Sequence, residues 1–81
     1  MKIIIAGSGC MKCNLTEKNV INACAELNID ADITHSRDVK EYLKIGVMIT
    51  PAVVVNDRVV VSGRVPTVEE LKKILSELLS S

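Results

Sequence analysis

Aromatic side chains are nearly missing from this sequence of 81 residues, which holds one Tyr and no Trp or Phe. Proteins that bind single-stranded nucleic acid stack the bases on aromatic rings, so this activity is excluded as the main one. A surplus of positive charge is also missing, because ten Lys and Arg residues face ten Asp and Glu residues. Nucleic acids and anionic membrane surfaces both attract a basic surplus, and we therefore expect neither as a partner.

Long apolar runs are absent as well. The run near the N-terminus, Ile3 to Ala6, is too short for a signal peptide or a membrane span. We therefore expect a cytosolic protein, in a compartment where thiols stay reduced. The chain length predicts a single domain over residues 1–81, and we expect a monomer.

The three cysteines are too few, and odd in number, for a disulfide scaffold. A cysteine pair in a reducing compartment is more often catalytic or metal-binding than structural. The cysteines are therefore the first place to look for chemistry.

The apolar pattern predicts the element order β-α-β-α-β-β-α, that is, an α/β fold with a four-stranded mixed sheet and three helices. A long helical crossover joins the first two strands, which makes them parallel, and the last two form an antiparallel hairpin around Asn56-Asp57. The first strand shows no alternation, so both of its faces should be covered. The expected strands span residues 2–6, 29–34, 52–55 and 58–61, and the first helix spans about 10–28.

Two capping boxes predict where the other helices begin. Asp38 is followed three residues later by Glu41, and Thr67 by Glu70 in the same way. Gly46 is the expected end of the middle helix.

The segment Cys10-Met11-Lys12-Cys13 carries the main chemical signal. It lies between a strand and a helix, and its two cysteines are about one helical turn apart. Cys10 is expected at the helix N-terminus, where free N–H groups and the helix dipole stabilise a thiolate, and Lys12 adds positive charge. Cys13 should lie inside the helix and be less exposed and less acidic. Such an unequal pair suits thiol–disulfide exchange.

Two other functions use the same two thiolates. A closed zinc site needs about four ligands, and beyond the cysteine pair the sequence offers only Cys24 and His35, which do not form a second closely spaced pair, so we expect no zinc. Two thiolates suffice for a soft ion, so a Cu(I) or soft-metal carrier stays open as an alternative. A redox-sensing interaction module, in which the disulfide controls partner binding, is the other alternative.

Thr50-Pro51 stands directly ahead of the apolar run Ala52 to Val55. Proline at the start of a strand is tolerated, and an ordinary trans proline is one interpretation. The other is a cis-proline loop that faces the cysteine pair and offers backbone groups to a substrate.

Together, these features resemble the thioredoxin superfamily, and most of all the small prokaryotic glutaredoxin-like thioredoxins, also called redox-active disulfide proteins. The resemblance covers essentially the whole chain. It rests on the C-x-x-C segment, on Thr50-Pro51 before a hairpin, on Gly63 after the hairpin and on the terminal helix. Two longer phrases, residues 46–56 and 66–71, are typical of that group.

The resemblance implies a minimal thioredoxin-like fold and a protein disulfide oxidoreductase without cofactor or metal. Cys10 would be the nucleophile and Cys13 the resolving cysteine, with electrons from a thioredoxin-reductase-type enzyme and disulfide-containing proteins as substrates. Thr50 and Pro51, with a cis bond between them, would flank the substrate. The residues between the cysteines, Met11 and Lys12, are the remaining expected substrate-binding residues.

Thioredoxins also keep a buried acid on the strand before the cysteine pair, and Ile3 to Ile5 offer none. Glu17 could move the proton instead, although we expect a solvated helix residue. His35 is expected at the surface, and Cys24 in the core, on the apolar stripe of the first helix. Tyr42 is expected against the edge of the sheet.

Overall fold

The computed structural model describes residues 1–9 and 11–80, so Cys10, the expected nucleophile, lies outside the described residues. Within this part, four strands and three helices follow one another in the predicted order. The strands are β1 (Lys2–Ala6), β2 (Asp32–Ser36), β3 (Ala52–Val55) and β4 (Arg58–Ser62). The helices are α1 (Met11–Glu26), α2 (Val39–Ile45) and α3 (Val68–Ser80).

The strands form one mixed sheet in the order β2-β1-β3-β4. As predicted, β1 and β2 are parallel and joined by α1, while β3 is antiparallel to both β1 and β4. The hairpin turns at Asn56 and Asp57, whose φ angles are 49° and 68°. Two positive φ angles match the twist of the strands in a two-residue turn, and these residue types tolerate them. The predicted α/β fold class is confirmed.

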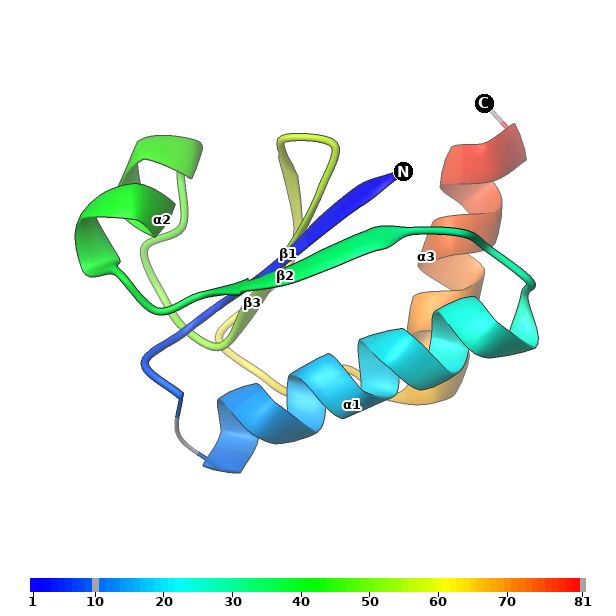
Figure 1. Ribbon diagram of the computed structural model, residues 1–81, viewed down its shortest axis with the longest axis horizontal. Helices are drawn as coiled ribbons and strands as arrows, with labels where there is room; N and C mark the ends of the chain where they lie inside the picture. The colour runs from blue at the N-terminus through cyan, green and yellow to red at the C-terminus, as the bar shows by residue number, and fades with distance from the viewer. Residues whose placement is uncertain (10, 81) are drawn as a thin grey trace.

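Two apolar clusters cover the two faces of the sheet. Along β1, Ile3 and Ile5 belong to the larger cluster, which includes residues of α1 and α3, while Ala6 belongs to the smaller one. Helices α1 and α3 contact each other, and Figure 1 shows α1 below the strands, α3 rising at the right and α2 at the upper left. The prediction that both faces of β1 are covered is therefore correct. Tyr42 of α2 is buried in the same cluster as Ala6 and Val54 of the central strands, while α2 itself contacts β2, the edge strand beside which Tyr42 was expected.

The boundaries between α1 and β2 differ from the prediction. Asn28 adopts a left-handed φ of 56°, and the amide of Ile29 donates to the carbonyl of Cys24 over 2.9 Å. With the bond from Asn28 to Ala25, this is the Schellman arrangement that ends a helix. Pairing with β1 starts only at Asp32, whose amide donates to Met1, so the predicted strand 29–34 lies at 32–36.

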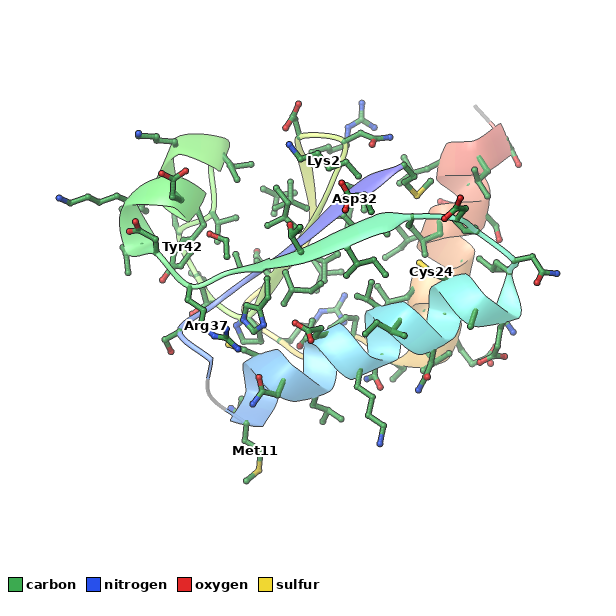
Figure 2. All side chains as sticks on the ribbon, in the orientation of Figure 1. Lys2, Met11, Cys24, Asp32, Arg37 and Tyr42 are labelled. Carbon is green, nitrogen blue, oxygen red and sulfur yellow. The ribbon has the colours of Figure 1, made fainter. Side chains whose placement is uncertain are left out.

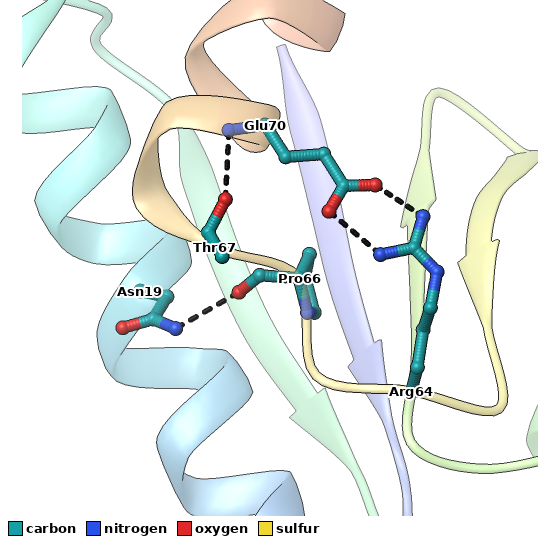
Figure 3. A network of polar contacts seen from close by, with 5 residues as sticks. All are labelled: Asn19, Arg64, Pro66, Thr67 and Glu70. Atoms are coloured by element: carbon teal, nitrogen blue, oxygen red, sulfur yellow. Dashed lines mark hydrogen bonds and ion pairs between the residues drawn. The ribbon is translucent and has the colours of Figure 1, made fainter.

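The predicted caps are present in part. Asp38 caps α2 by accepting a hydrogen bond from the Lys40 amide over 3.0 Å, and Gly46 ends α2 with φ 103°. At α3, Thr67 accepts from the Glu70 amide over 3.1 Å, but the Glu70 carboxylate binds Arg64 instead of completing a capping box (Figure 3).

Candidate active site

Cys13 lies in the first turn of α1 and its side chain is fully buried. Its thiol rests on Gly7, the residue after β1. A Cβ added to Gly7 would overlap Cys13 Sγ and lie 3.1 Å from Cys13 Cβ. The φ angle of Gly7 is outside the left-handed region, so space alone requires glycine here. Gly7 thus holds the thiol against the end of the sheet.

The loop that contains Thr50 and Pro51 is far from Cys13 in the sequence, but it also lies beside Gly7. The peptide bond between Thr50 and Pro51 is cis. The Gly7 Cβ position lies 3.8 Å from Thr50 Cβ, so Cys13 and Thr50 flank one glycine. Pro51 is buried, and its carbonyl accepts a hydrogen bond of 2.9 Å from the amide of Gly63 at the end of β4. The hairpin therefore anchors the proline loop beside Cys13, and the fold brings together three of the expected site residues.

The two residues between the cysteines face outward. Met11 is 86% exposed and points away from the body of the molecule at the start of α1 (Figure 2), and Lys12 is exposed as well. The amide group of Asn14 donates to the carbonyl of Gly9 over 3.4 Å, which ties the first turn of α1 to the loop before it.

Two further apolar side chains are exposed just before the proline. Met48 is 86% and Ile49 62% exposed, and Ile49 Cγ2 lies 3.0 Å from the Cβ position of Gly63. Neighbouring exposed apolar side chains can serve as a contact site for another chain. Sequence reasoning missed them, although two large apolar residues ahead of Thr50-Pro51 were a visible signal.

The sequence matches known proteins over nearly its whole length. Residues 1–76 match the family model described as the thioredoxin domain. A thioredoxin of Methanocaldococcus jannaschii is 46% identical over 77 residues, which cover 95% of this chain and 88% of that protein. A thioredoxin of Methanothermobacter thermautotrophicus is 41% identical over 76 residues, which cover 94% of this chain and 99% of that protein.

The chain belongs to the thioredoxin family. The resemblance to the thioredoxin superfamily is thereby confirmed, and with it a place among thiol–disulfide oxidoreductases. Among the residues that the structure describes, no helix is long and apolar enough to cross a membrane. Within the same residues, no group of three or more His, Cys, Asp and Glu side chains is placed to hold a metal ion.

In this thioredoxin-family chain, a cation also lies beside the cysteine segment. A Cβ on Gly9, which has φ 90°, would lie 2.8 Å from Nε of Arg37. Figure 2 shows Arg37 between the end of β2 and the first turn of α1. Sequence reasoning missed this residue, because only the parallel pairing of β1 and β2 brings its side chain to the loop.

His35 is not the surface residue that we expected. It lies on β2 with a side chain only 6% exposed, and its Nδ1 lies 2.8 Å from Oε1 of Glu17 on α1. Glu17 is therefore not simply a solvated helix residue. Its polar neighbours on β2, Thr34 and Ser36, gave no warning of burial, and the partner comes from a helix 18 residues away in the sequence.

Cys24 lies in the larger apolar cluster and is 4% exposed, as predicted. Burial raises the pKa of its thiol above the ordinary value. An inert thiol is expected in such apolar surroundings.

Proposed function

We propose that this protein reduces disulfide bonds in protein substrates through Cys10 and Cys13. The observation that carries the proposal is the packing of the Cys13 thiol against Gly7, next to Thr50 and the cis-proline loop. A resolving thiol held at that loop can meet a substrate chain that lies along it. The family to which the chain belongs supports the same chemistry.

Cys10 is the proposed nucleophile. It directly precedes Met11, the first residue of α1, and a helix N-terminus favours an anion through its free N–H groups and dipole. Among the described residues of the first turn of α1, none is acidic. Lys12 and Arg37 contribute positive charge to the segment, which also favours a thiolate over a thiol.

The proposed substrates are folded or partly folded proteins, because the surroundings of the cysteine segment offer apolar contacts. Met11, Met48 and Ile49 would pack against a partner surface, while Thr50 and Pro51 would flank the substrate backbone. Lys12 would lie beside the bound chain.

The reaction balances with two electrons. The Cys10 thiolate attacks one substrate sulfur and releases the other as a thiol, and Cys13 then attacks Cys10 to release the second. The substrate gains two electrons and two protons, and the protein becomes a disulfide. A thioredoxin-reductase-type enzyme is the proposed electron donor. The proposed location is the cytosol. The protein is proposed to act as a monomer of one domain, without a bound cofactor.

The experiment that tests the proposal is trapping with single substitutions. Cys13→Ser should still attack a substrate disulfide and then stall, because a hydroxyl cannot displace the sulfur near neutral pH. The stalled mixed disulfide is seen as a higher band without reductant, in a lysate that contains oxidised proteins. Cys24→Ser is the matched control and should trap nothing.

Cys10→Ser separates the alternatives. The reductase predicts no trapped partner from this variant, whereas a Cu(I) carrier predicts that either substitution abolishes copper binding and that neither traps a partner. A redox sensor predicts slow turnover of insulin disulfides with a partner bound in one redox state. Equal trapping by Cys10→Ser and Cys13→Ser, or none by either, contradicts the proposal.

A further inference from the structure

The imidazole of His35 is a buried titratable group that the proposed reaction has not yet used. Its side chain is 6% exposed and lies on the face of β2 that packs toward α1, next to Ile5 in the register of the parallel strands. Buried polar atoms in proteins are nearly always hydrogen-bonded, so an exception points to a function.

The two ring nitrogens of His35 differ. Nδ1 lies 2.8 Å from Oε1 of Glu17, and a carboxylate can only accept, so Nδ1 carries the hydrogen and donates. In the neutral ring, Nε2 is then an acceptor with a lone pair. Nε2 is buried and has no hydrogen-bond partner among the residues that the structure describes. The protein thus holds an oriented base inside the interface between α1 and β2.

This base lies at the Cys13 end of α1. Cys13 and Glu17 are four residues apart on the helix, so their Cβ atoms are ~5–6 Å apart on the same side. The Cys13 thiol rests on Gly7, and the amide of Gly7 donates to the carbonyl of Ser36, the residue after His35, over 3.0 Å. The thiol and the imidazole therefore lie at the same end of the β1–β2 pair.

We propose that His35 accepts the proton of the Cys13 thiol, and that Glu17 is the positioning residue that orients the ring. This inference rests on the proposed reduction of disulfides. Some group must take the proton of the Cys13 thiol. On β1, the strand before the cysteine pair, Ile3 to Ile5 offer no acidic side chain for this role. A thiol buried at this site cannot pass its proton directly to bulk water.

The step begins from the mixed disulfide between Cys10 and the substrate. The S–H bond of Cys13 breaks and its proton moves to Nε2 of His35, directly or through one water molecule. The Cys13 thiolate attacks Sγ of Cys10, a new S–S bond forms, and the bond from Cys10 to the substrate breaks. The substrate sulfur leaves with the electron pair and takes up a proton from the imidazolium or from water. The Glu17 carboxylate stabilises the imidazolium while it exists.

The charged groups around His35 set the expected pH dependence. On α1 these are Cys13 and Glu17, and beyond β2 it is Arg37, whose side chain turns toward Gly9. The stretch of β1 beside the ring, residues 3–7, carries no ionisable side chain. Loss of the base should therefore matter most near pH 7, and matter less near pH ~9, where a cysteine thiol ionises without help.

The test follows the two half-reactions separately. Reduced protein is mixed with excess insulin as the substrate disulfide, quenched with acid at successive times, and analysed by mass spectrometry for the mixed disulfide and for the internal disulfide. The variants are His35→Gln, which keeps a polar group for Glu17 but cannot take a proton, and Glu17→Gln. The matched controls are Thr34→Gln, an exposed neighbour on β2, and Glu26→Gln at the far end of α1.

We expect His35→Gln to form the mixed disulfide at the wild-type rate and to resolve it about tenfold or more slowly near pH 7. The deficit should shrink as the pH rises toward ~9. Glu17→Gln should show a smaller deficit with the same pH trend, and both controls should behave as wild type. A purely structural role would slow both steps at every pH.

Wild-type resolution in both variants near pH 7, or a deficit that is the same at every pH, overturns the assignment of His35 and leaves the proposed function standing. If His35→Gln fails to fold, as judged by circular dichroism, Glu17→Gln decides by the same pH trend. Failure of the wild-type protein to form any mixed disulfide overturns the proposed function and this inference together.

Discussion

Cys13 and Cys24 lie on the same helix and both are buried, but the two halves of α1 give them different neighbours. Cys24 packs with Val20, Leu71 and Leu75 in the larger apolar cluster. Around Cys13 the same helix presents Thr16, whose hydroxyl donates to the carbonyl of Lys12 over 2.8 Å. It also presents Glu17, which holds His35.

If Cys13 resolves the mixed disulfide as proposed, burial by itself does not make a thiol inert. In the Cys24 half, apolar neighbours offer no group that could take a proton or stabilise a charge. In the Cys13 half, the helix ends at a loop with Gly7 and Gly9, and polar side chains reach in from β2. One helix thus packs into the core along most of its length and lines the proposed reaction site at its start.

Among the variants that test this difference between the two halves of α1, Gly7→Ala is expected to have the largest effect. The new methyl group would overlap the Cys13 thiol, which must then move. Overpacking of a close-packed site costs ~1–3 kcal/mol of unfolding free energy. A displacement of about 1 Å can slow a reaction ~10²-fold, and we expect at least a tenfold loss of insulin-disulfide turnover.

Turnover and denaturant unfolding of Gly7→Ala are measured together. The control is Ser8→Ala, which changes the exposed next residue and should leave both quantities near wild type. Normal turnover by Gly7→Ala would mean that the position of the Cys13 thiol does not matter for the reaction.

Cys24→Ala tests the other half of α1. Removing one buried heavy atom from the apolar cluster should lower the unfolding free energy by about 1 kcal/mol and leave turnover unchanged. Unfolding in urea and insulin reduction are the two measurements. A loss of turnover without a loss of stability would show that the core half takes part in the chemistry.

The same variant gives a pH test. Burial raises the pKa of the Cys24 thiol above its ordinary value of 9.0, so above that pH the unfolded chain ionises this thiol before the folded one does. Stability from the neutral thiol is therefore complete below pH 9.0 and is lost as the pH rises through the folded-state pKa. The decline in stability of the wild type above this pH should be steeper than that of Cys24→Ala.

The smallest effect is expected from Glu26→Gln, in the last turn of α1. Glu26 accepts from Nζ of Lys72 on α3 over 3.1 Å, a contact that raises the pKa of Lys72. Ion pairs between exposed side chains contribute little and are screened by salt. We expect a slight decrease in Tm that disappears at high salt, and unchanged turnover. If Glu26→Gln also slowed turnover, an effect of Glu17→Gln could no longer be assigned to the contact between Glu17 and His35.

Several features of this protein were predictable from the sequence because they depend on neighbours along the chain. The order of the strands and helices and the place of Cys13 inside the first helix needed only local patterns. The same is true of the Asn56-Asp57 turn, where both residues accept positive φ, and of Asp38 as a helix cap. Cys24 followed from helical periodicity, since a residue on the apolar stripe packs into the core.

Other features were decided by the tertiary structure, because they join residues that only the folded sheet brings together. Glu70 does not complete the capping box, because the loop after β4 brings Arg64 to its carboxylate. The Cys13 thiol needs the bare backbone of Gly7, and that close approach follows from the way α1 folds back on the end of β1. His35 was expected at the surface because it stands at the end of a strand with one polar face, although alternation along β2 places it on the same face as Ile33. The packing of α1 on that face covers the ring, and Glu17 of the helix lies 2.8 Å from its Nδ1, a contact that only the folded structure brings about.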